Sequence, residues 1–371
     1  MNVCFNSNHT VLVVLSLLLI SSVLADDDSI DSSRAQAIAH FEAVNPPELI
    51  QIVADARDWL QQHPDPTYRS LGLIHDTLPG FSSFIDQPNL KNNSNKVQHF
   101  LARVEQLLME QPEAPALFFL MLACKDHELL SECDAIGLLD ALDQKAPGNL
   151  AVWGTVAGLA SWGTLVADHY ADPIDAILRA DTLNVYSGDA SAAWREALYA
   201  TKQANHLNYA SLESSIPLIN PDTLIPWLAG MFGLSIIHKT MIPFGIFFDI
   251  CSAESNQHPG SEMVASCDRL TSMLRGHREV MIFLLIGLRV SADLAESREQ
   301  LDLAEHYAQI NHAWRDWMKC VNLQTEEFRS RGSEQFANHV LDLRIQYGEV
   351  GGKIQLAEEM NVSCGPVPSD L

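Results

Sequence analysis

The feature that most constrains the fold is the spacing of apolar residues, which recur at helical intervals along almost the whole chain. The spacing is clear in Val97, Phe100, Leu101, Val104, Leu107 and Leu108. Apolar residues three or four positions apart form one face of an α-helix, whereas a half-buried strand needs strict alternation, which is scarce here. The sequence therefore predicts an all-α fold.

Helix starts are indicated by capping side chains. Asn45, Asp172 and Asn220 each precede a proline, and Asn95 precedes Lys96. An Asn or Asp side chain accepts a hydrogen bond from a free N–H of the first turn. Proline at the first helical position loses no bond, because its missing N–H would be unpaired there. We expect helices to begin directly after these residues.

Two prolines mark a repeating unit. Pro112 and Pro147 lie 35 residues apart, each after an amphipathic segment and before a segment rich in Leu, Ala and aromatics. A weaker third copy begins at Ile174, with its turn expected at 181–184. A period of this length indicates consecutive helix hairpins.

The second turn carries the residues Ala146, Pro147, Gly148 and Asn149, followed by Trp153 and Ala157. This turn resembles the junction of tetratricopeptide-type repeats, whose period is about 34 residues, although the full consensus is not matched throughout. This turn, together with the uncharged segment 1–25 and the helix pairs flanked by Cys124 and Cys133 and by Cys251 and Cys267, is also similar to a diffuse set of uncharacterised exported helical proteins of Gram-negative bacteria. The repeat resemblance covers roughly 80 residues and implies stacked antiparallel hairpins and, by analogy, a surface that binds another protein. It assigns no site residues. We expect the hairpin-repeat region, a solenoid, to span 34–205.

Beyond residue 205 the period fades and long apolar segments follow, such as Leu224–Ile237 and Ile242–Ile250. Leu224–Ile237 has no charge but is too short to cross a bilayer, which takes about 18 residues or more, so we expect a buried core helix. The region 206–371 is expected to be helical and packed on the first region.

The first 25 residues carry no charged side chain, and their apolar run from Val11 to Ile20 is broken only by Ser16. This pattern is typical of a signal peptide, with cleavage expected after Ala25. A retained anchor is the alternative, but the run is shorter than a membrane span. The acidic segment 26–33 is then a disordered linker, and the protein is expected to be periplasmic or secreted.

The formal net charge is −24, from 23 basic and 47 acidic side chains. Nucleic acids and anionic lipids attract proteins through clustered Lys and Arg, and the sequence has no such cluster. We therefore expect no nucleic-acid partner and, after leader cleavage, no stable membrane insertion. The acidity indicates solubility in an exported protein, with specific cation binding as the alternative.

Cleavage would remove Cys4 and leave six cysteines: Cys124, Cys133, Cys251, Cys267, Cys320 and Cys364. An even number in an exported chain predicts disulfides. The first two flank a turn between apolar segments, and the next two flank a polar stretch, so each pair suits a clip between neighbouring helices. The last two pair by elimination. Short C-x-x-C spacings are absent, which argues against zinc.

Catalytic motifs are missing from the sequence, including phosphate loops, the G-x-S-x-G elbow, S-x-x-K and the dinucleotide fingerprint. The segment 127–131 begins like a zinc-protease helix, but Ser131 replaces the second histidine. His306 and His312 are six residues apart, too far around a helix to share a metal. We therefore predict no catalytic residue, no cofactor and no metal site.

Two weaker polar groups fit ordinary structural roles. His312 and Asp316 are four residues apart, which suits a surface hydrogen bond. The run 277–279, His-Arg-Glu, opens an apolar segment and is interpreted as a polar helix start. The tryptophans of the chain's two regions are expected in the core, with an exposed binding groove as the alternative: Trp153, Trp162, Trp194, Trp314 and Trp317.

The sequence favours an exported, non-enzymatic helical-repeat protein that serves as a scaffold for another protein. The alternative is a hydrolase or a ligand-binding protein with a site in the helical C-terminal half. The two differ in shape, because a ligand site requires a pocket lined by polar or titratable groups.

Overall fold

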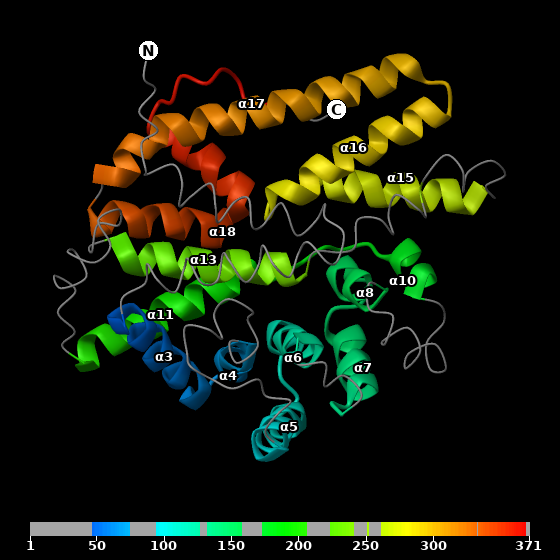
Figure 1. Ribbon diagram of the computed structural model, residues 1–371. Coiled ribbons are helices and arrows are strands. Elements are labelled where there is room, and N and C mark those ends of the chain that lie inside the picture. The colour runs from blue at the N-terminus through cyan, green and yellow to red at the C-terminus, as the bar shows by residue number, and fades with distance from the viewer. Residues whose placement is uncertain are drawn as a thin grey trace, which may run out of the picture.

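The computed structural model describes residues 47–74, 94–126, 132–157, 173–205, 223–240, 251, 261–331 and 333–368. Within these ranges the chain forms thirteen α-helices, and its only β-type pairing is an isolated bridge between Asn149 and Thr182 (Figure 1). The all-α prediction is confirmed for this part of the chain. The predicted leader 1–25 and linker 26–33 lie outside it, as do Trp162 and segment 127–131.

The thirteen described helices follow in chain order. The first eight are α3 (Pro47–Gln62), α4 (Pro66–Ile74), α5 (Ser94–Met109), α6 (Ala114–Asp126), α7 (Ala135–Lys145), α8 (Leu150–Ala157), α10 (Pro173–Arg179) and α11 (Ser187–Asn205). The remaining five are α13 (Leu224–Lys239), α15 (Ser261–Gly276), α16 (Met281–Ser297), α17 (Leu301–Arg331) and α18 (Glu334–Glu359).

The turns predicted from the prolines are present. Segment 110–113 separates α5 from α6, and segment 146–149 separates α7 from α8. The third turn lies between α10 and α11. Asn149, in the second turn, forms hydrogen bonds with it. Its Nδ2 donates to the Asn184 carbonyl at 3.0 Å, and its Oδ1 accepts from the Asn184 N–H at 3.0 Å. These two asparagines are 35 residues apart, the interval that separates Pro112 from Pro147.

The packing between these helices is as follows. Helix α6 packs most extensively against α4, and α8 packs against α10. A regular tetratricopeptide-like stack therefore stays a prediction. The boundary near residue 206 also stays a prediction, and α11 and α13 on its two sides pack closely against each other.

Helix α7 is capped by Asp134, which accepts a hydrogen bond from the Gly137 N–H at 3.0 Å. One predicted helix start, that of α5, is corrected. Helix α5 begins at Ser94, so Asn95 lies inside its first turn. Asn, Ser and Asp are nearly equivalent caps, so a run such as 92–95 gives the sequence no means to choose among them. Helix α10 begins at Pro173, as expected.

Three disulfides join the cysteine pairs that the spacing predicts. The Cα atoms are 6.3 Å apart for Cys124–Cys133, 5.8 Å for Cys251–Cys267 and 5.7 Å for Cys320–Cys364. The first bond closes the connection from α6 to α7. The third ties the C-terminal tail to α17, where Gln324 also accepts a hydrogen bond from the Ser363 N–H at 3.1 Å.

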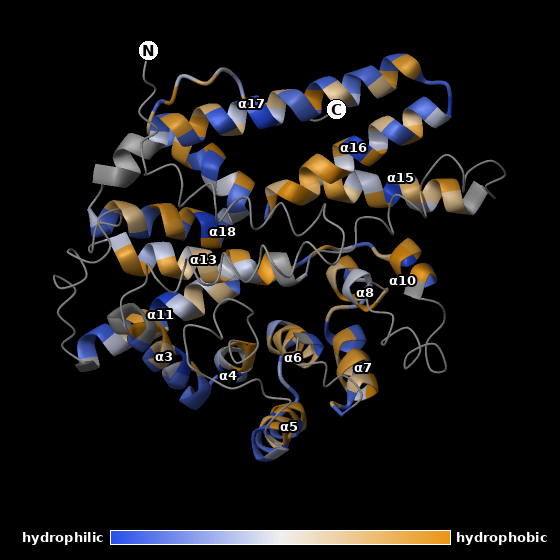
Figure 2. Ribbon diagram, viewed as in Figure 1, coloured by the Kyte–Doolittle hydropathy of each residue, from blue (hydrophilic) through white to orange (hydrophobic). Residues whose placement is uncertain are grey.

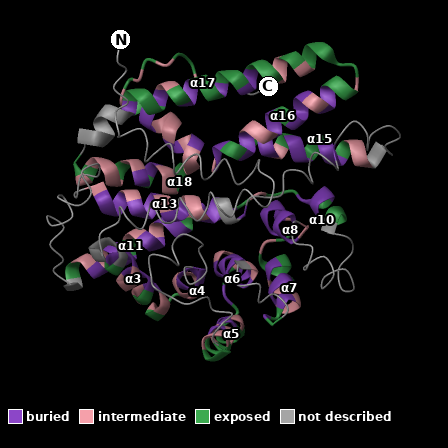
Figure 3. Cartoon of the chain, viewed as in Figure 1, coloured by how far each residue is buried: buried purple, intermediate pink, exposed green. Residues whose placement is uncertain are grey.

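The apolar core has one large cluster, which runs from α3 to α13 and reaches Phe283 and Leu341, and a second cluster where α16, α17 and α18 meet. Figure 2 shows α6 and α13 as mainly hydrophobic, and Figure 3 shows much of α17 exposed. Four of the five tryptophans predicted in the core lie in the described structure, and all four are buried: Trp153, Trp194, Trp314 and Trp317.

The crossing of α11 and α13 depends on a glycine. A Cβ atom at Gly233 would collide with the Ser191 hydroxyl and lie 2.7 Å from the Ser187 carbonyl oxygen. Next to this contact, Trp194 stacks on Phe232 with ring centroids 3.8 Å apart. The missing side chain lets the two helices approach closely, and the aromatic pair fills the space beside them.

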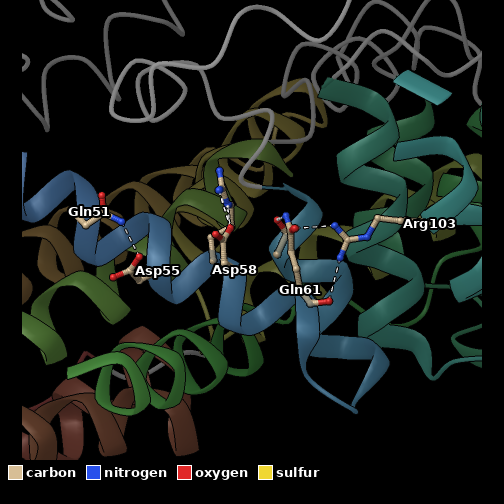
Figure 4. A network of polar contacts seen from close by, with 7 residues as sticks. Gln51, Asp55, Asp58, Gln61 and Arg103 are labelled. Atoms are coloured by element: carbon tan, nitrogen blue, oxygen red, sulfur yellow. Dashed lines mark hydrogen bonds and ion pairs between the residues drawn. The ribbon is translucent and has the colours of Figure 1, made fainter. Parts of the chain in front are cut away.

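A polar contact fixes α5 against α3. Arg103 donates to the Gln61 side-chain oxygen at 2.7 Å and to the Gln61 carbonyl at 3.0 Å (Figure 4). Gln61 lies in the last turn of α3, where carbonyl groups lack helical partners and a cation is favourable. Gln61 in turn donates to the Gly72 carbonyl at 3.0 Å, so α3, α4 and α5 share one set of hydrogen bonds.

Candidate functional site

A cavity of about 240 Å³ lies among α15, α16 and the start of α17. Its lining comprises Asp268, Thr271, Arg275, Ser291, Leu294, Ala295, Arg298, Gln300, Leu303 and Tyr307. On each helix most of these residues are spaced by three or four positions, so each helix contributes a single face. Figure 1 shows the three helices folded back on one another in a zigzag.

Close packing of α15 against α16 positions the first face. A Cβ atom at Gly287 would lie 2.7 Å from Leu274 Cβ, so only glycine allows the observed approach. The approach holds the end of α15, with Arg275, directly beside α16. Both helices are amphipathic and bury apolar side chains on their other faces, while several of their polar side chains line the cavity.

The turn from α16 to α17 positions the second arginine. Gln300 N–H donates to the Ala295 carbonyl at 2.9 Å, and Glu299 N–H donates to the Glu296 carbonyl at 3.0 Å. These two bonds form a Schellman motif, which needs a left-handed residue at its centre. Glu299 takes that conformation, with φ 61°. The motif turns the chain sharply and brings Arg298 and Gln300 to the cavity.

Each arginine has one contact of its own inside the lining. Arg298 Nη1 donates to the Asp268 carboxylate at 2.8 Å. The guanidinium of Arg275 lies over the ring of Tyr307, 4.6 Å from its centroid. A guanidinium on an aromatic face keeps its N–H groups free to bind an anion at its edge.

Two buried polar atoms of the lining have no hydrogen-bond partner, namely Arg298 Nη2 and Ser291 Oγ. Ser291 is buried, at 5% exposure. A buried donor without a partner costs about 1–3 kcal/mol, so native proteins rarely keep one without a reason such as a bound molecule. Both residues line the cavity, although the two atoms themselves have almost no accessible surface.

The described lining consists mainly of hydrogen-bond donors. Among its described residues there is no histidine, lysine or cysteine to serve as a base or nucleophile, and its carboxylate, Asp268, is bound to Arg298. Two guanidinium groups, an amide and several hydroxyls can donate hydrogen bonds. Against a chain charge of −24, the described lining has two cations and one anion. Guanidinium groups bind carboxylates and phosphates through paired hydrogen bonds.

A second polar cluster lies where α11, α16 and α18 meet. Glu279 accepts hydrogen bonds from the Ser187 N–H at 2.9 Å, the Ser187 hydroxyl at 3.0 Å and the Val185 N–H at 3.4 Å. Glu349 on α18 accepts a hydrogen bond of 3.0 Å from the N–H of Met281, the first residue of α16. The two carboxylates therefore cap helices to which they do not belong.

Burial changes the pKa values in this cluster. It raises the pKa of Glu279, although hydrogen bonds from Ser187 act in the opposite direction. Burial, with a further contribution from the Arg278 charge, lowers the pKa of His277 to about 4. The run 277–279, interpreted from sequence as a polar helix start, is thus a junction between three helices. Its carboxylate is fully used in capping, so we assign it a structural role.

The other candidates from the sequence do not form a site in the described structure. His312 and Asp316 are exposed on α17, and His306 lies elsewhere around the same helix with its Nε2 buried and unpartnered. Within the described ranges no three His, Cys, Asp or Glu residues gather closely enough to hold a metal ion. No described helix combines the length and apolar character that a membrane crossing requires.

Sequence reasoning missed every residue of the cavity. One signal was present: Ser291 interrupts the apolar face of α16, and Arg275 and Arg298 lie near helix ends on either side of it. Comparisons with protein-family models, with curated proteins and with solved structures found no match for this chain.

Proposed function

We propose that the protein is an exported, non-enzymatic binding protein that holds a small anionic solute in the cavity among α15, α16 and α17. The observation that carries the proposal is the pair of arginines that line one cavity with a single carboxylate, in a chain whose net charge is −24. An anion bound there would accept charge-assisted hydrogen bonds from the two guanidinium groups.

The size of the cavity limits the solute. About 240 Å³ lies below the roughly 300–1,000 Å³ of pockets for drug-sized ligands. A nucleotide or a peptide would not fit inside, whereas a small organic acid or an inorganic oxyanion would. Export is supported by the apolar leader in the sequence and by three disulfides, which form in oxidising compartments.

The scaffold role favoured by the sequence remains a second proposal with weaker support. The large apolar side chains exposed on the described surface are spread over five helices: Met109, Ile174, Ile282, Leu301, Leu303, Leu323 and Tyr347. Scattered exposed apolar residues are normal for a monomer, whereas a docking site presents a contiguous patch. The geometry therefore favours the solute over a protein partner.

Isothermal titration calorimetry of the oxidised chain with acetate, sulfate and phosphate at low ionic strength tests the proposal. At least one anion should bind with a stoichiometry of one. Arg275→Gln and Arg298→Gln should each weaken that binding at least about tenfold, since a hydrogen bond to a charged group contributes about 1.5–3 kcal/mol.

Arg289→Gln is the matched control, because Arg289 lies on α16 with its side chain 68% exposed and pairs with Asp293 outside the cavity. It should bind as the wild type does. Circular dichroism establishes that all variants keep their helices. Absence of binding by these anions and by the carboxylates titrated below, or equal loss in the Arg289 variant, would refute the proposal.

A further inference from the structure

The cavity has two cationic ends. On α15, Asp268 and Arg275 are seven residues apart, which is about 10 Å along a helix. Arg298 contacts Asp268 and so lies at one end, while Arg275 lies over Tyr307 at the other. Helix α16 runs antiparallel to α15, with Gly287 beside Arg275 and Arg298 on Asp268. Ser291 is seven residues before Arg298 on α16, so it lies on the side toward Arg275.

Apolar side chains also line the cavity. Leu294, Ala295 and Leu303 lie between the two ends in chain position, and Thr271 is the polar residue among them. Ala295 is buried at 3% exposure and Leu294 at 3%. A compact inorganic ion would leave these apolar side chains without contacts. A ligand with an aliphatic spacer and a charge at each end matches the lining throughout.

The two ends differ in how their charge is balanced. Arg275 makes no ion pair among the described residues, whereas Arg298 already holds Asp268. That pair is partly open to solvent, with side chains 30% and 52% exposed for Arg298 and Asp268. An exposed ion pair is weak, so an incoming carboxylate can replace Asp268 at a cost of about fivefold in affinity or less.

We propose that the occupant is a linear dicarboxylate with an aliphatic spacer, and that Asp268 is a resident counter-anion which it displaces. One carboxylate pairs with Arg275 and the Ser291 hydroxyl, and the other takes the place of Asp268 on Arg298. This inference rests on the proposed function and adds the class of solute and the residue that opposes its binding. No covalent step is involved.

A series of ligands tests it by calorimetry: succinate, glutarate, adipate, pimelate and suberate, with butyrate and hexanoate as single-charge counterparts. One spacer length should bind best, at least about tenfold more tightly than hexanoate. Arg275→Gln and Arg298→Gln should each reduce that dicarboxylate to the affinity of hexanoate. Arg289→Gln should change nothing, as before.

Asp268→Asn is the decisive variant. It should tighten the best dicarboxylate by up to about fivefold, because the competing carboxylate is gone and the amide binds Arg298 weakly. Its melting temperature without ligand checks that the fold is intact. Weaker binding by Asp268→Asn would show that Asp268 supports the ligand and does not compete with it.

The outcomes separate the two proposals. If hexanoate binds as tightly as any dicarboxylate and only one arginine matters, the solute is a single anion, and this inference fails while the proposed function stands. If no anion binds to the wild-type chain, both fail together.

Discussion

The carboxylate of Glu279 closes the start of α11, although 92 residues separate it from Ser187, whose N–H it accepts at 2.9 Å. It accepts the Ser187 hydroxyl as well, at 3.0 Å. A helix start leaves N–H groups without partners, and α11 obtains its cap from the linker between α15 and α16. The two halves of the chain are thereby joined by a helix cap in addition to apolar packing.

Glu279→Ala should lower the free energy of unfolding by about 2–3 kcal/mol, because it leaves two backbone N–H groups and a hydroxyl without an acceptor. Glu279→Gln should cost less, since its amide oxygen can still accept and the buried charge is removed. Urea denaturation measures both. Glu296→Ala, at an exposed glutamate of α16, should stay within about 0.5 kcal/mol of wild type. Equal effects at both positions would argue against the cap.

Gly348→Ala should destabilise the protein by at least about 3 kcal/mol. Gly348 interrupts α18 with φ 77° and ψ −179°, a conformation that is essentially restricted to glycine. A Cβ there would also lie 2.6 Å from the Arg278 carbonyl oxygen. This kink lets Glu349 N–H donate to the Glu279 carbonyl at 2.7 Å.

Gly276→Ala is the control for that change, because a Cβ at Gly276 has nothing within 4 Å. It should alter the unfolding midpoint in urea little. A Gly348→Ala protein as stable as the Gly276→Ala protein would mean that α18 can straighten.

Cys133→Ser should lower the melting temperature and leave the helical circular dichroism signal largely unchanged. The bond to Cys124 spans nine residues, and closing so short a loop stabilises the folded state by roughly 2–3 kcal/mol through the unfolded chain. Peptide mapping without reductant should recover the two cysteines in one linked species. Recovery of Cys124 linked to another cysteine would contradict the assigned pairing.

Local features of this fold could be predicted from the sequence, because their causes are local. The turns at Pro112 and Pro147 follow from proline chemistry, and the pairing of Cys124 with Cys133 follows from the turn between them. The helical class follows from apolar spacing.

The cavity and the Glu279 cap could not be predicted, because both depend on contacts between distant segments. Arg275 and Arg298 belong to different helices, and only the observed packing of α15 on α16 brings their side chains to one space. The partner of Glu279 is 92 residues away. A polar residue on a helix can face solvent, a cap or a cavity, and its own neighbours in the chain do not distinguish these cases.

His277 should make stability fall as the pH drops from about 6.5 to about 4. Burial lowers the pKa of His277 to about 4 from its ordinary 6.5. Above pH 6.5 the imidazole is neutral in the folded and the unfolded chain. Between pH 6.5 and 4 the unfolded chain binds a proton that the folded chain does not, so the free energy of unfolding falls, by roughly 3 kcal/mol at most.

Urea denaturation across this pH range measures the slope, with His277→Leu as the test and His312→Leu, at an exposed position, as the control. The raised pKa of Glu279 acts in the opposite direction, because the folded chain then binds its proton more tightly. The comparison between variants removes that contribution. His277→Leu should flatten the pH dependence and His312→Leu should not. The same slope in all three proteins would show that folding does not lower the pKa of His277.

Glu299→Gly should stabilise the protein by about 1 kcal/mol. Glu299 holds φ 61° at the centre of the turn from α16 to α17, and a residue with a Cβ pays roughly 1–2 kcal/mol for that conformation. Glycine adopts this conformation without that energetic cost. It also raises the conformational entropy of the unfolded chain, which offsets part of the gain in stability. The same substitution at Glu296, in the last turn of α16, should have the opposite sign and cost up to about 1 kcal/mol, since glycine is a poor helix former.

Thermal and urea unfolding of the two single variants compare the positions directly. Opposite signs identify the left-handed turn that carries Arg298 and Gln300 to the cavity, whereas destabilisation by both variants would mean that the chain does not make this turn at Glu299.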